Sequence, residues 1–197
     1  MLLLSDKLTS VPVMSLQTGG ELARTSGVII DPRTMSIPAL RVTGPQLDSA
    51  HTVLHTEDIR ESGSLGFIID DSTKLMSLEG LVRLQEVIDF HFTITACDVF
   101  DQTGKKLGRV SDFSFDPTTF TIQQIYIKQR FLQSLTSTSH IISRSQIVTV
   151  TPTRIVVETP TVTESNRDQD AETSGFTNPF RTGSVAQPDQ ADSSSSG

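Results

Sequence analysis

The residue types that most often perform acid–base, nucleophilic or metal chemistry are sparse in this chain of 197 residues. The only cysteine is Cys97, and the histidines are His51, His55, His91 and His140. A single cysteine forms neither an intramolecular disulfide nor a cysteine-based zinc site. Cys97 lies in an apolar stretch, where a free cysteine is commonly a small buried packing residue. We therefore predict no catalytic residue, no metal site and no cofactor.

Other familiar chemical motifs are also missing. The adjacent carboxylates Asp70-Asp71 and Glu57-Asp58 fall where strands are expected to end, and a general acid–base pair would need a cleft there. The glycines of TGGE and TGKK do not match a phosphate-binding loop, which ends in Gly-Lys-Ser or Gly-Lys-Thr. The sequence predicts a protein that is not an enzyme.

A group of basic residues is the first candidate binding site. It consists of Lys105, Lys106, Arg109, Lys128 and Arg130, with Phe131 beside the last. Such a patch is suited to an RNA contact, whereas the alternative is a solvated hairpin edge whose charges discourage aggregation. The formal net charge is −7, so the overall field does not attract nucleic acid, and no DNA binding is expected.

The end of the chain holds a second candidate. After Glu158 large apolar residues are few, and we expect disorder over residues 159–197 because burial cannot offset the ordering entropy. Within this tail, Phe176 and Phe180 flank Asn178-Pro179. This pattern resembles a short linear docking motif for a partner protein. The alternatives are a chance pair of aromatics or a segment that packs on its own protein.

The elements that position these residues are repeated along the chain. TGGELARTSGVIIDPRTMSIPALRV starts at Thr18 and TGKKLGRVSDFSFDPTTFTIQQIYI starts at Thr103, an offset of 103 − 18 = 85. Glycine, leucine, arginine and the Asp-Pro pair coincide in order at this offset. Further along the offset grows by three, which indicates a three-residue insertion between Gln129 and Ser139. Internal repeats of this kind indicate repeated structural units.

Each copy is predicted to be built of strands. Asp31-Pro32-Arg33-Thr34 and Asp116-Pro117-Thr118-Thr119 are turn sequences with proline at the second position, and β-branched or aromatic residues flank both. Pro38 interrupts a predicted strand of the first copy, and it lacks an amide hydrogen. That strand is therefore expected to be an edge or to be bulged at this point.

One helix is expected between the copies, from Leu78 to Ile88, with Ser77 as its N-cap. Gly80 weakens its first turn. The apolar face that includes Leu81 and Leu84 should pack on a strand-built unit, because an isolated helix of this length is marginal in water.

These strands and turns resemble those of the PRC-barrel family, named for the photosynthetic reaction centre H subunit. The second copy, TGKKLGRVSDFSFDPTT from Thr103 to Thr119, is the stronger match, whereas the first has Ala23 in place of Gly108. The resemblance implies an all-β fold of two tandem small barrels. The expected parts are a first barrel at residues 1–72, a connecting helix at 73–90, a second barrel at 91–158 and the disordered tail at 159–197.

The resemblance also implies a function. Its members include the C-terminal domain of the ribosome maturation factor, which engages a small-subunit protein, and components of archaeal cell-division assemblies. Their shared theme is docking onto a protein surface. We expect a non-catalytic adaptor with a protein partner. The alternative is an RNA-processing or ribosome-assembly factor that uses the basic patch. Short apolar stretches and one cysteine favour a cytoplasmic protein without membrane insertion.

Overall fold

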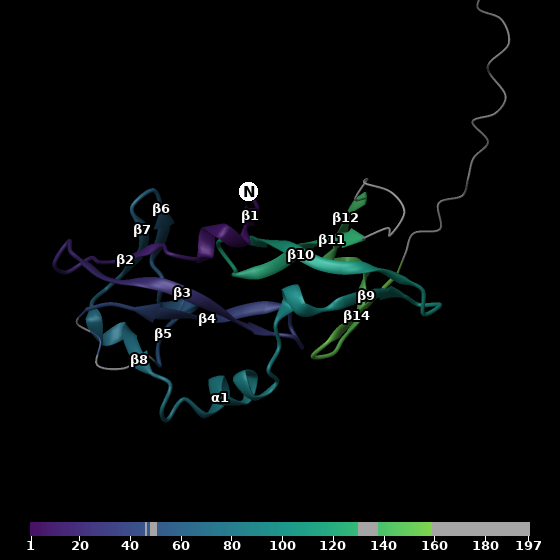
Figure 1. Ribbon diagram of the computed structural model, residues 1–197. Helices are drawn as coiled ribbons and strands as arrows, with labels where there is room; N and C mark the ends of the chain where they lie inside the picture. Colours follow the sequence, from purple (N-terminus) through teal and green to yellow (C-terminus); the bar gives the residue numbers. More distant parts are fainter. Residues whose placement is uncertain (46, 48–50, 130–137, 159–197) are drawn as a thin grey trace, which may run out of the picture. The chain divides into compact units, whose positions relative to one another are not determined.

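The computed structural model describes residues 1–45, 47, 51–129 and 138–158. These residues belong to one compact unit, Met1–Pro160. Most of them are in β-strands of a single connected sheet, and the part described contains one α-helix, α1 (Val82–Asp89) (Figure 1). This agrees with the expected all-β class. The expected disordered tail, its docking motif from Phe176 to Phe180, and Arg130 lie outside the described residues.

The strands fall into two sets, one before and one after α1. The first set is β1 (Leu3–Leu4), β2 (Pro12–Ser15), β3 (Glu21–Asp31), β4 (Ser36–Thr43), β5 (Thr52–His55), β6 (Glu61–Gly63), β7 (Gly66–Ile69) and β8 (Leu75–Ser77). The second set is β9 (Asp98–Asp101), β10 (Lys106–Asp116), β11 (Thr121–Gln129), β12 (Thr138–Ser143), β13 (Ile147–Val150) and β14 (Arg154–Val157). Single-turn 3₁₀ helices connect several of them, including η2 (Thr56–Asp58) and η5 (Arg144–Gln146).

Six strands of each set follow the same order. In the first half β2, β3, β4 and β5 are antiparallel neighbours, and β7 returns to lie parallel to β2 with β6 outside it. In the second half β9, β10, β11 and β12 are antiparallel neighbours, and β14 lies parallel to β9 with β13 outside it. Since β6 and β13 each have a single partner among the described strands, the sheet is open.

Residue pairing within the two halves follows the offsets of the sequence. Arg24 of β3 faces Thr43 of β4. Arg109 of β10 faces Lys128 of β11, with both positions 85 residues further along, and both hairpins break register at the equivalent place. Leu40 faces Leu54 across β4 and β5, whereas Ile125 faces Ile142 across β11 and β12. The shift by three therefore falls between β11 and β12, where the sequence indicates an insertion.

Local backbone geometry follows the expected turns. Pro38 lies within β4, between the Ile29–Ala39 and Asp31–Ser36 pairs, where the register of the β3–β4 ladder shifts. The bulge accommodates a residue that has no amide hydrogen to donate, as expected from the sequence.

Two equivalent turns join the halves. Ser36 of β4 faces Thr121 of β11, 85 residues away. The Ile37 amide donates to the Phe120 carbonyl at 2.8 Å, and the Ile122 amide donates to the Met35 carbonyl at 2.9 Å. Each donor and acceptor of one bond has its counterpart in the other at the offset of 85. The contact is thus reciprocal, as at the two-fold interface of a homodimer.

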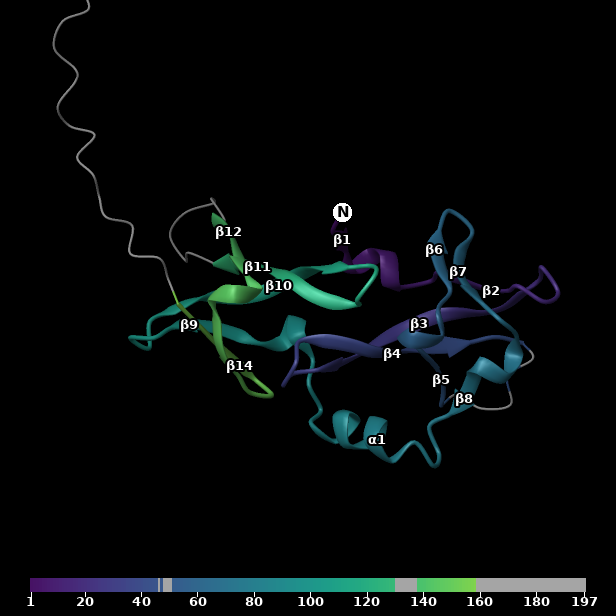
Figure 2. The same ribbon diagram turned by 180° about the vertical axis from the view of Figure 1, so that it is seen from behind.

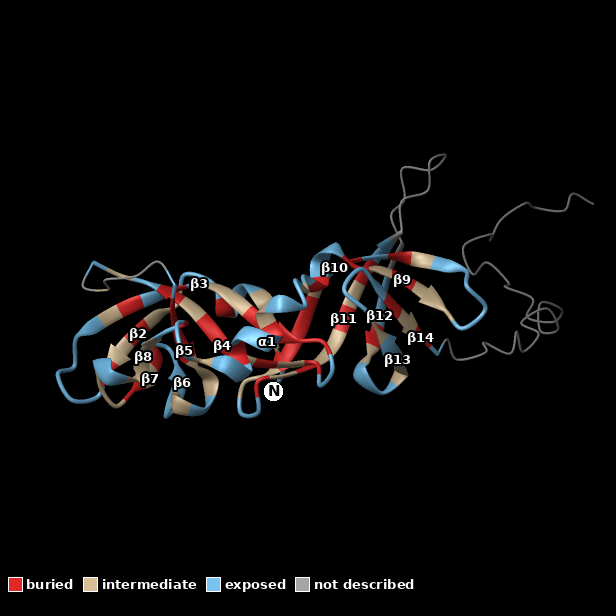
Figure 3. Cartoon of the chain, turned by 90° about the horizontal axis from the view of Figure 1, so that it is seen from below, coloured by how far each residue is buried: buried red, intermediate tan, exposed pale blue. Residues whose placement is uncertain are grey.

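A core that both halves share lies at this contact. Met35, Ile37 and Phe67 of the first half cluster with Phe115 and Phe120 of the second, and all are at most 5% exposed. The Phe120 ring lies 6.0 Å from that of Phe67 and 5.9 Å from that of Phe115. Figure 3 shows buried segments along β3, β4, β10 and β11 (Figure 3). Apolar burial across the contact is the main force that holds the halves together.

The helix is present but begins later than expected. Ser77 ends β8, and the N-cap position is Leu81, so the prediction of Ser77 as N-cap is wrong. Gly80 explains the delay, since its φ of 91° lies in the left-handed region and interrupts any helix that starts at Leu78. Leu84 and Val87 pack on residues of β3, β4 and β5, so the expected burial of this face is confirmed. Figure 2 shows α1 lying below β3 and β4 (Figure 2).

Candidate functional site

A row of charged residues crosses four strands of the second half. Arg154 of β14 faces Asp98 of β9, and Asp98 also faces Arg109 of β10. Arg109 in turn faces Lys128 of β11. Directly opposed residues of neighbouring strands project from the same face of a sheet. The four side chains therefore form a continuous row on one face.

Asp98 organises the centre of this row. Its carboxylate accepts hydrogen bonds from Lys106 Nζ at 2.6 Å and from Arg109 Nε at 3.0 Å. The bond from Lys106, followed by that from Arg109, holds the pKa of Asp98 below its ordinary value. The carboxylate stays ionised at neutral pH and restrains two cations that would otherwise sample many rotamers.

The cations at the two ends of the row, Arg154 and Lys128, have different surroundings. The Arg154 guanidinium lies over the ring of Phe100, 4.1 Å from its centroid. Lys128 is exposed and forms no ion pair among the described residues. We call this surface the basic face, and its members are Lys106, Arg109, Lys128 and Arg154 with Asp98 and Phe100.

The basic face is hollowed at its centre. A concavity of about 660 Å³ is lined by Asp98, Lys106, Gly108, Arg109, Val110, Ser111 and Lys128. Gly108 contributes no side chain to it. Cations around a hollow suit a ligand that carries carboxylate or phosphate groups, since charge-assisted hydrogen bonds are among the strongest in proteins.

Equivalent positions of the first half show that the fold does not require these charges. The strand pairing gives each of these residues a counterpart in the first half. The counterpart of Arg154 is Gly66, and that of Asp98 is Pro12. Arg109 corresponds to Arg24, Lys128 to Thr43 and Lys106 to Glu21. The only cation of this set, Arg24, is paired with Glu21 at 2.7 Å. The same strand arrangement thus carries a face without excess charge in one half and four cations against one carboxylate in the other.

The structure brings together three of the five basic residues singled out in the sequence. Lys106, Arg109 and Lys128 share the basic face, whereas Lys105 lies in the exposed turn before β10 and Arg130 is outside the described residues. The sequence reasoning missed Arg154. Its place beside Asp98 depends on the parallel pairing of β14 with β9, between segments more than fifty residues apart.

No protein-family model matches the chain, and no curated protein matches its sequence. The geometry of the described residues therefore carries the functional argument. Within them, no helix is both long enough and apolar enough to cross a bilayer.

Cys97 is a packing residue. It is fully buried, and its Sγ lies 3.5 Å from the Thr93 carbonyl oxygen and 3.7 Å from that of Pro152. Burial, with a smaller effect of Asp98, raises the pKa of the thiol to about 11. The thiolate, which is the nucleophilic form, is therefore scarce at neutral pH.

The closely spaced histidines and the adjacent carboxylates were the next candidates for chemistry. His51 and His55 are four residues apart, a spacing that suits a metal on a helix, but His55 ends the extended strand β5. No group of three or more His, Cys, Asp or Glu side chains in the described ranges is placed to hold a metal ion. Asp58 pairs with Lys74 at 2.7 Å, and Asp70 receives two bonds of 2.9 Å from Arg60.

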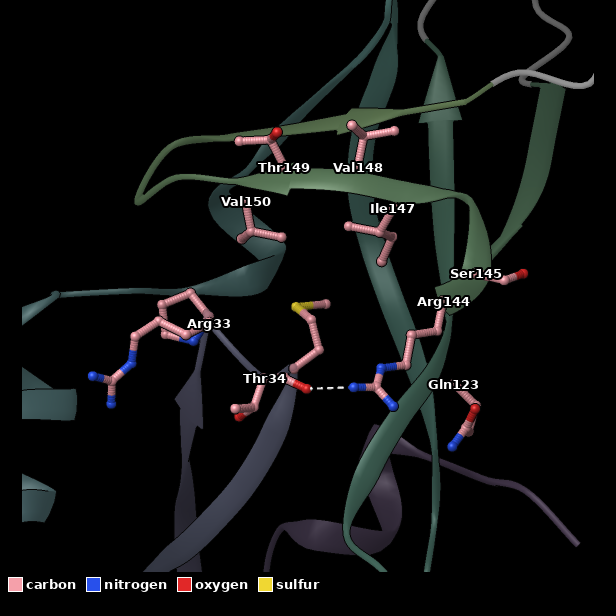
Figure 4. A pocket seen from close by; sticks show the side chains of 11 residues that line it. Arg33, Thr34, Gln123, Arg144, Ser145, Ile147, Val148, Thr149 and Val150 are labelled. Carbon is pink, nitrogen blue, oxygen red and sulfur yellow. Dashed lines mark hydrogen bonds between the residues drawn. The ribbon is translucent and has the colours of Figure 1, made fainter.

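A second concave surface lies where the halves meet. It has a volume of about 760 Å³ between the turn of β3 and β4 and the segment from η5 to β13 (Figure 4). The Arg144 guanidinium crosses it, and its Nη2 donates to the Thr34 carbonyl at 2.8 Å. We call this surface the junction groove. The sequence does not indicate this groove, because its two walls come from different repeats.

Proposed function

We propose that this chain is a non-catalytic adaptor of the cytoplasm, built from two tandem PRC-type barrels, and that its basic face binds an acidic segment of a partner protein. The observation that carries the proposal is the row of cations across β14, β9, β10 and β11, which has no counterpart in the first half. Clustered charges that the fold does not need are typical of a binding surface.

Support for the PRC-type architecture comes from the strand pattern. Each half joins a Gly-containing turn, a long hairpin closed by an Asp-Pro turn, and a later strand that returns parallel to the strand before that hairpin. The two Asp-Pro turns also hold equivalent conformations, since Met35 and Phe120 have φ values of 52° and 50°. The likeness of the halves supports two units of one type.

An acidic protein segment suits this face better than RNA does. Single-stranded RNA is usually held by aromatic side chains on which bases stack. Phe100 is the aromatic side chain of the basic face, and Arg154 covers its ring. The net charge of −7 also opposes a long polyanion, whereas a short acidic segment interacts mainly with nearby cations.

The alternative is an RNA-processing or ribosome-assembly factor that uses the same cations together with Lys105 and Arg130. The exposed Lys128 favours this alternative, because it has no carboxylate partner in the part of the chain described and is available to a phosphate. The same experiment separates the two functions.

Binding of the full chain to a fluorescent oligoglutamate and to an oligouridine of equal length tests the proposal. The K128E/R154E double variant should weaken oligoglutamate binding by about tenfold or more, since two attractive charges become repulsive. The control Arg24→Glu with Thr43→Glu places two carboxylates on the corresponding face of the first half, at the counterparts of Arg109 and Lys128, and should change oligoglutamate binding less than about twofold. Preferential binding of oligouridine would establish the RNA alternative. Binding of neither probe would exclude the basic face as a site.

A further inference from the structure

β13 is a short edge strand that carries no charged residue, and its ladder with β14 shifts register at Val148. It pairs with β14 alone among the described strands, and its sequence is Ile147-Val148-Thr149-Val150. All four residues are β-branched and none is charged. Val148 is 54% exposed. An exposed edge of this composition is a ready template for another strand.

The equivalent edge of the first half is protected. Arg60 occupies the position that corresponds to Val148, and its guanidinium forms two hydrogen bonds of 2.9 Å with Asp70. Glu61 follows at the position of Thr149. Natural sheets place charges at their edges to prevent association. The second half therefore lacks, on the same scaffold, a protection that the first half has.

The junction groove runs beside this edge. In Figure 4, Ile147 and Val150 point toward the turn that carries Thr34, and both are half-buried (Figure 4). Arg33 already forms two bonds with Asp31, at 3.0 and 2.8 Å. Arg144 has only the Thr34 carbonyl as a described partner and no carboxylate. The groove thus combines an apolar wall with one cation whose charge is not compensated.

We propose that β13 and the junction groove together bind an extended segment of a partner protein, which adds to the sheet as a strand beside β13. The partner segment carries alternating apolar side chains and one carboxylate that pairs with Arg144. Main-chain hydrogen bonds to the edge supply affinity, and the groove selects the side chains that face it. The four residues of β13 allow pairing over roughly 13 Å.

Charge and shape select this occupant. Alternate residues of a strand point to one side, so one row of a bound segment faces Ile147 and Val150 while the other faces solvent. Arg144 matches a carboxylate and provides a planar pair of donors for it. This site is separate from the basic face and does not depend on the function proposed for that face.

A phage-displayed random-peptide library, selected against the full chain, provides the probe. Enriched peptides should share alternating apolar residues with an acidic residue, and synthetic copies should bind with measurable affinity. Val148→Arg installs the residue type of the first half and should weaken binding by about tenfold or more. Ile141→Arg adds the same charge to an exposed position of another edge strand, β12, and should leave binding unchanged.

Two further measurements do not depend on a substitution in β13. Peptides N-methylated at alternate amides should lose binding, since they cannot donate to an edge strand, while amide exchange at residues 147–150 should slow with the unmodified peptide. Arg144→Gln should weaken the binding of acidic peptides but not the binding of their neutral analogues. Failure to enrich peptides, equal binding of methylated peptides, or equal binding to Val148→Arg would overturn the proposal. So would a dimer of the free chain that Val148→Arg dissociates, because a second copy would then occupy the edge.

Discussion

Substitutions of Phe120 test the contact between the halves in two ways. One is the size of the loss in the free energy of unfolding, and the other is the order of stability of the alanine and glycine variants. The Phe120 side chain is 5% exposed and packs against Phe67 and Phe115 in the shared core. Its backbone has a φ of 50°, in the left-handed region that residues with a Cβ atom avoid. The residue therefore combines a large stabilising side chain with a strained backbone.

Replacing Phe120 by alanine removes the ring and retains the strain. The loss of a buried phenylalanine costs about 3–5 kcal/mol, and the two ring contacts place Phe120→Ala in the upper part of that range. Phe120→Gly removes the same ring but relieves the left-handed strain, which is about 1–2 kcal/mol for a residue with a Cβ atom. The glycine variant should therefore be about 1 kcal/mol more stable than the alanine variant.

Urea denaturation followed by far-ultraviolet circular dichroism measures both free energies of unfolding. Phe113 provides the matched control, since it is 3% exposed but lies within the extended strand β10. There glycine should be less stable than alanine by about 0.5–1 kcal/mol, the usual order. If Phe120→Gly were as destabilised as Phe120→Ala or more so, the assigned backbone strain would be wrong.

Three other predictions concern the helix, the first Asp-Pro turn and the tail. Leu84→Asp should destabilise the protein by about 3 kcal/mol or more, because Leu84 is buried, whereas the exposed Val82→Asp should be nearly neutral in the same urea assay. The hydrogen bond from Arg33 lowers the pKa of Asp31 below its ordinary value of 3.8. The ionised Asp31 therefore stabilises the fold above that pH, and this stabilisation is lost as the pH falls through the lowered pKa. The urea midpoint of Asp31→Asn should accordingly decline less on acidification than that of the unsubstituted chain. Limited proteolysis should cleave the chain first after residue 159. The double variant Phe176→Ala with Phe180→Ala should weaken the binding of a partner protein without changing the melting temperature. A lower melting temperature would show that the segment packs on its own protein.

Sequence reasoning succeeded where the determinants are local. The Asp-Pro turns and the strands beside them are specified by neighbouring residues, and the observed hairpins follow the offset of 85. The residue type of Ser77 predicts a helix that starts too early, because the left-handed Gly80 decides where helical geometry begins. A favourable cap does not overcome a backbone break that follows it.

Long-range pairing explains what the sequence could not supply. Three cations of the basic face belong to one hairpin and could be grouped in advance, but Arg154 joins them only through the parallel pairing of β14 with β9. The junction groove depends on β4 meeting β11, a contact between repeats. Neither pairing leaves a periodic pattern in the sequence, because each is selected by the packing of the whole unit.

The reciprocal contact between the halves has a consequence for how such a protein changes. In a dimer of identical chains every substitution appears twice, so a new lysine on one face is also present on the symmetry-related face. Here both halves belong to one chain, and Lys128 has Thr43 as its counterpart while Val148 has Arg60. Covalent linkage therefore keeps the stability of a symmetric contact and frees each face to vary independently.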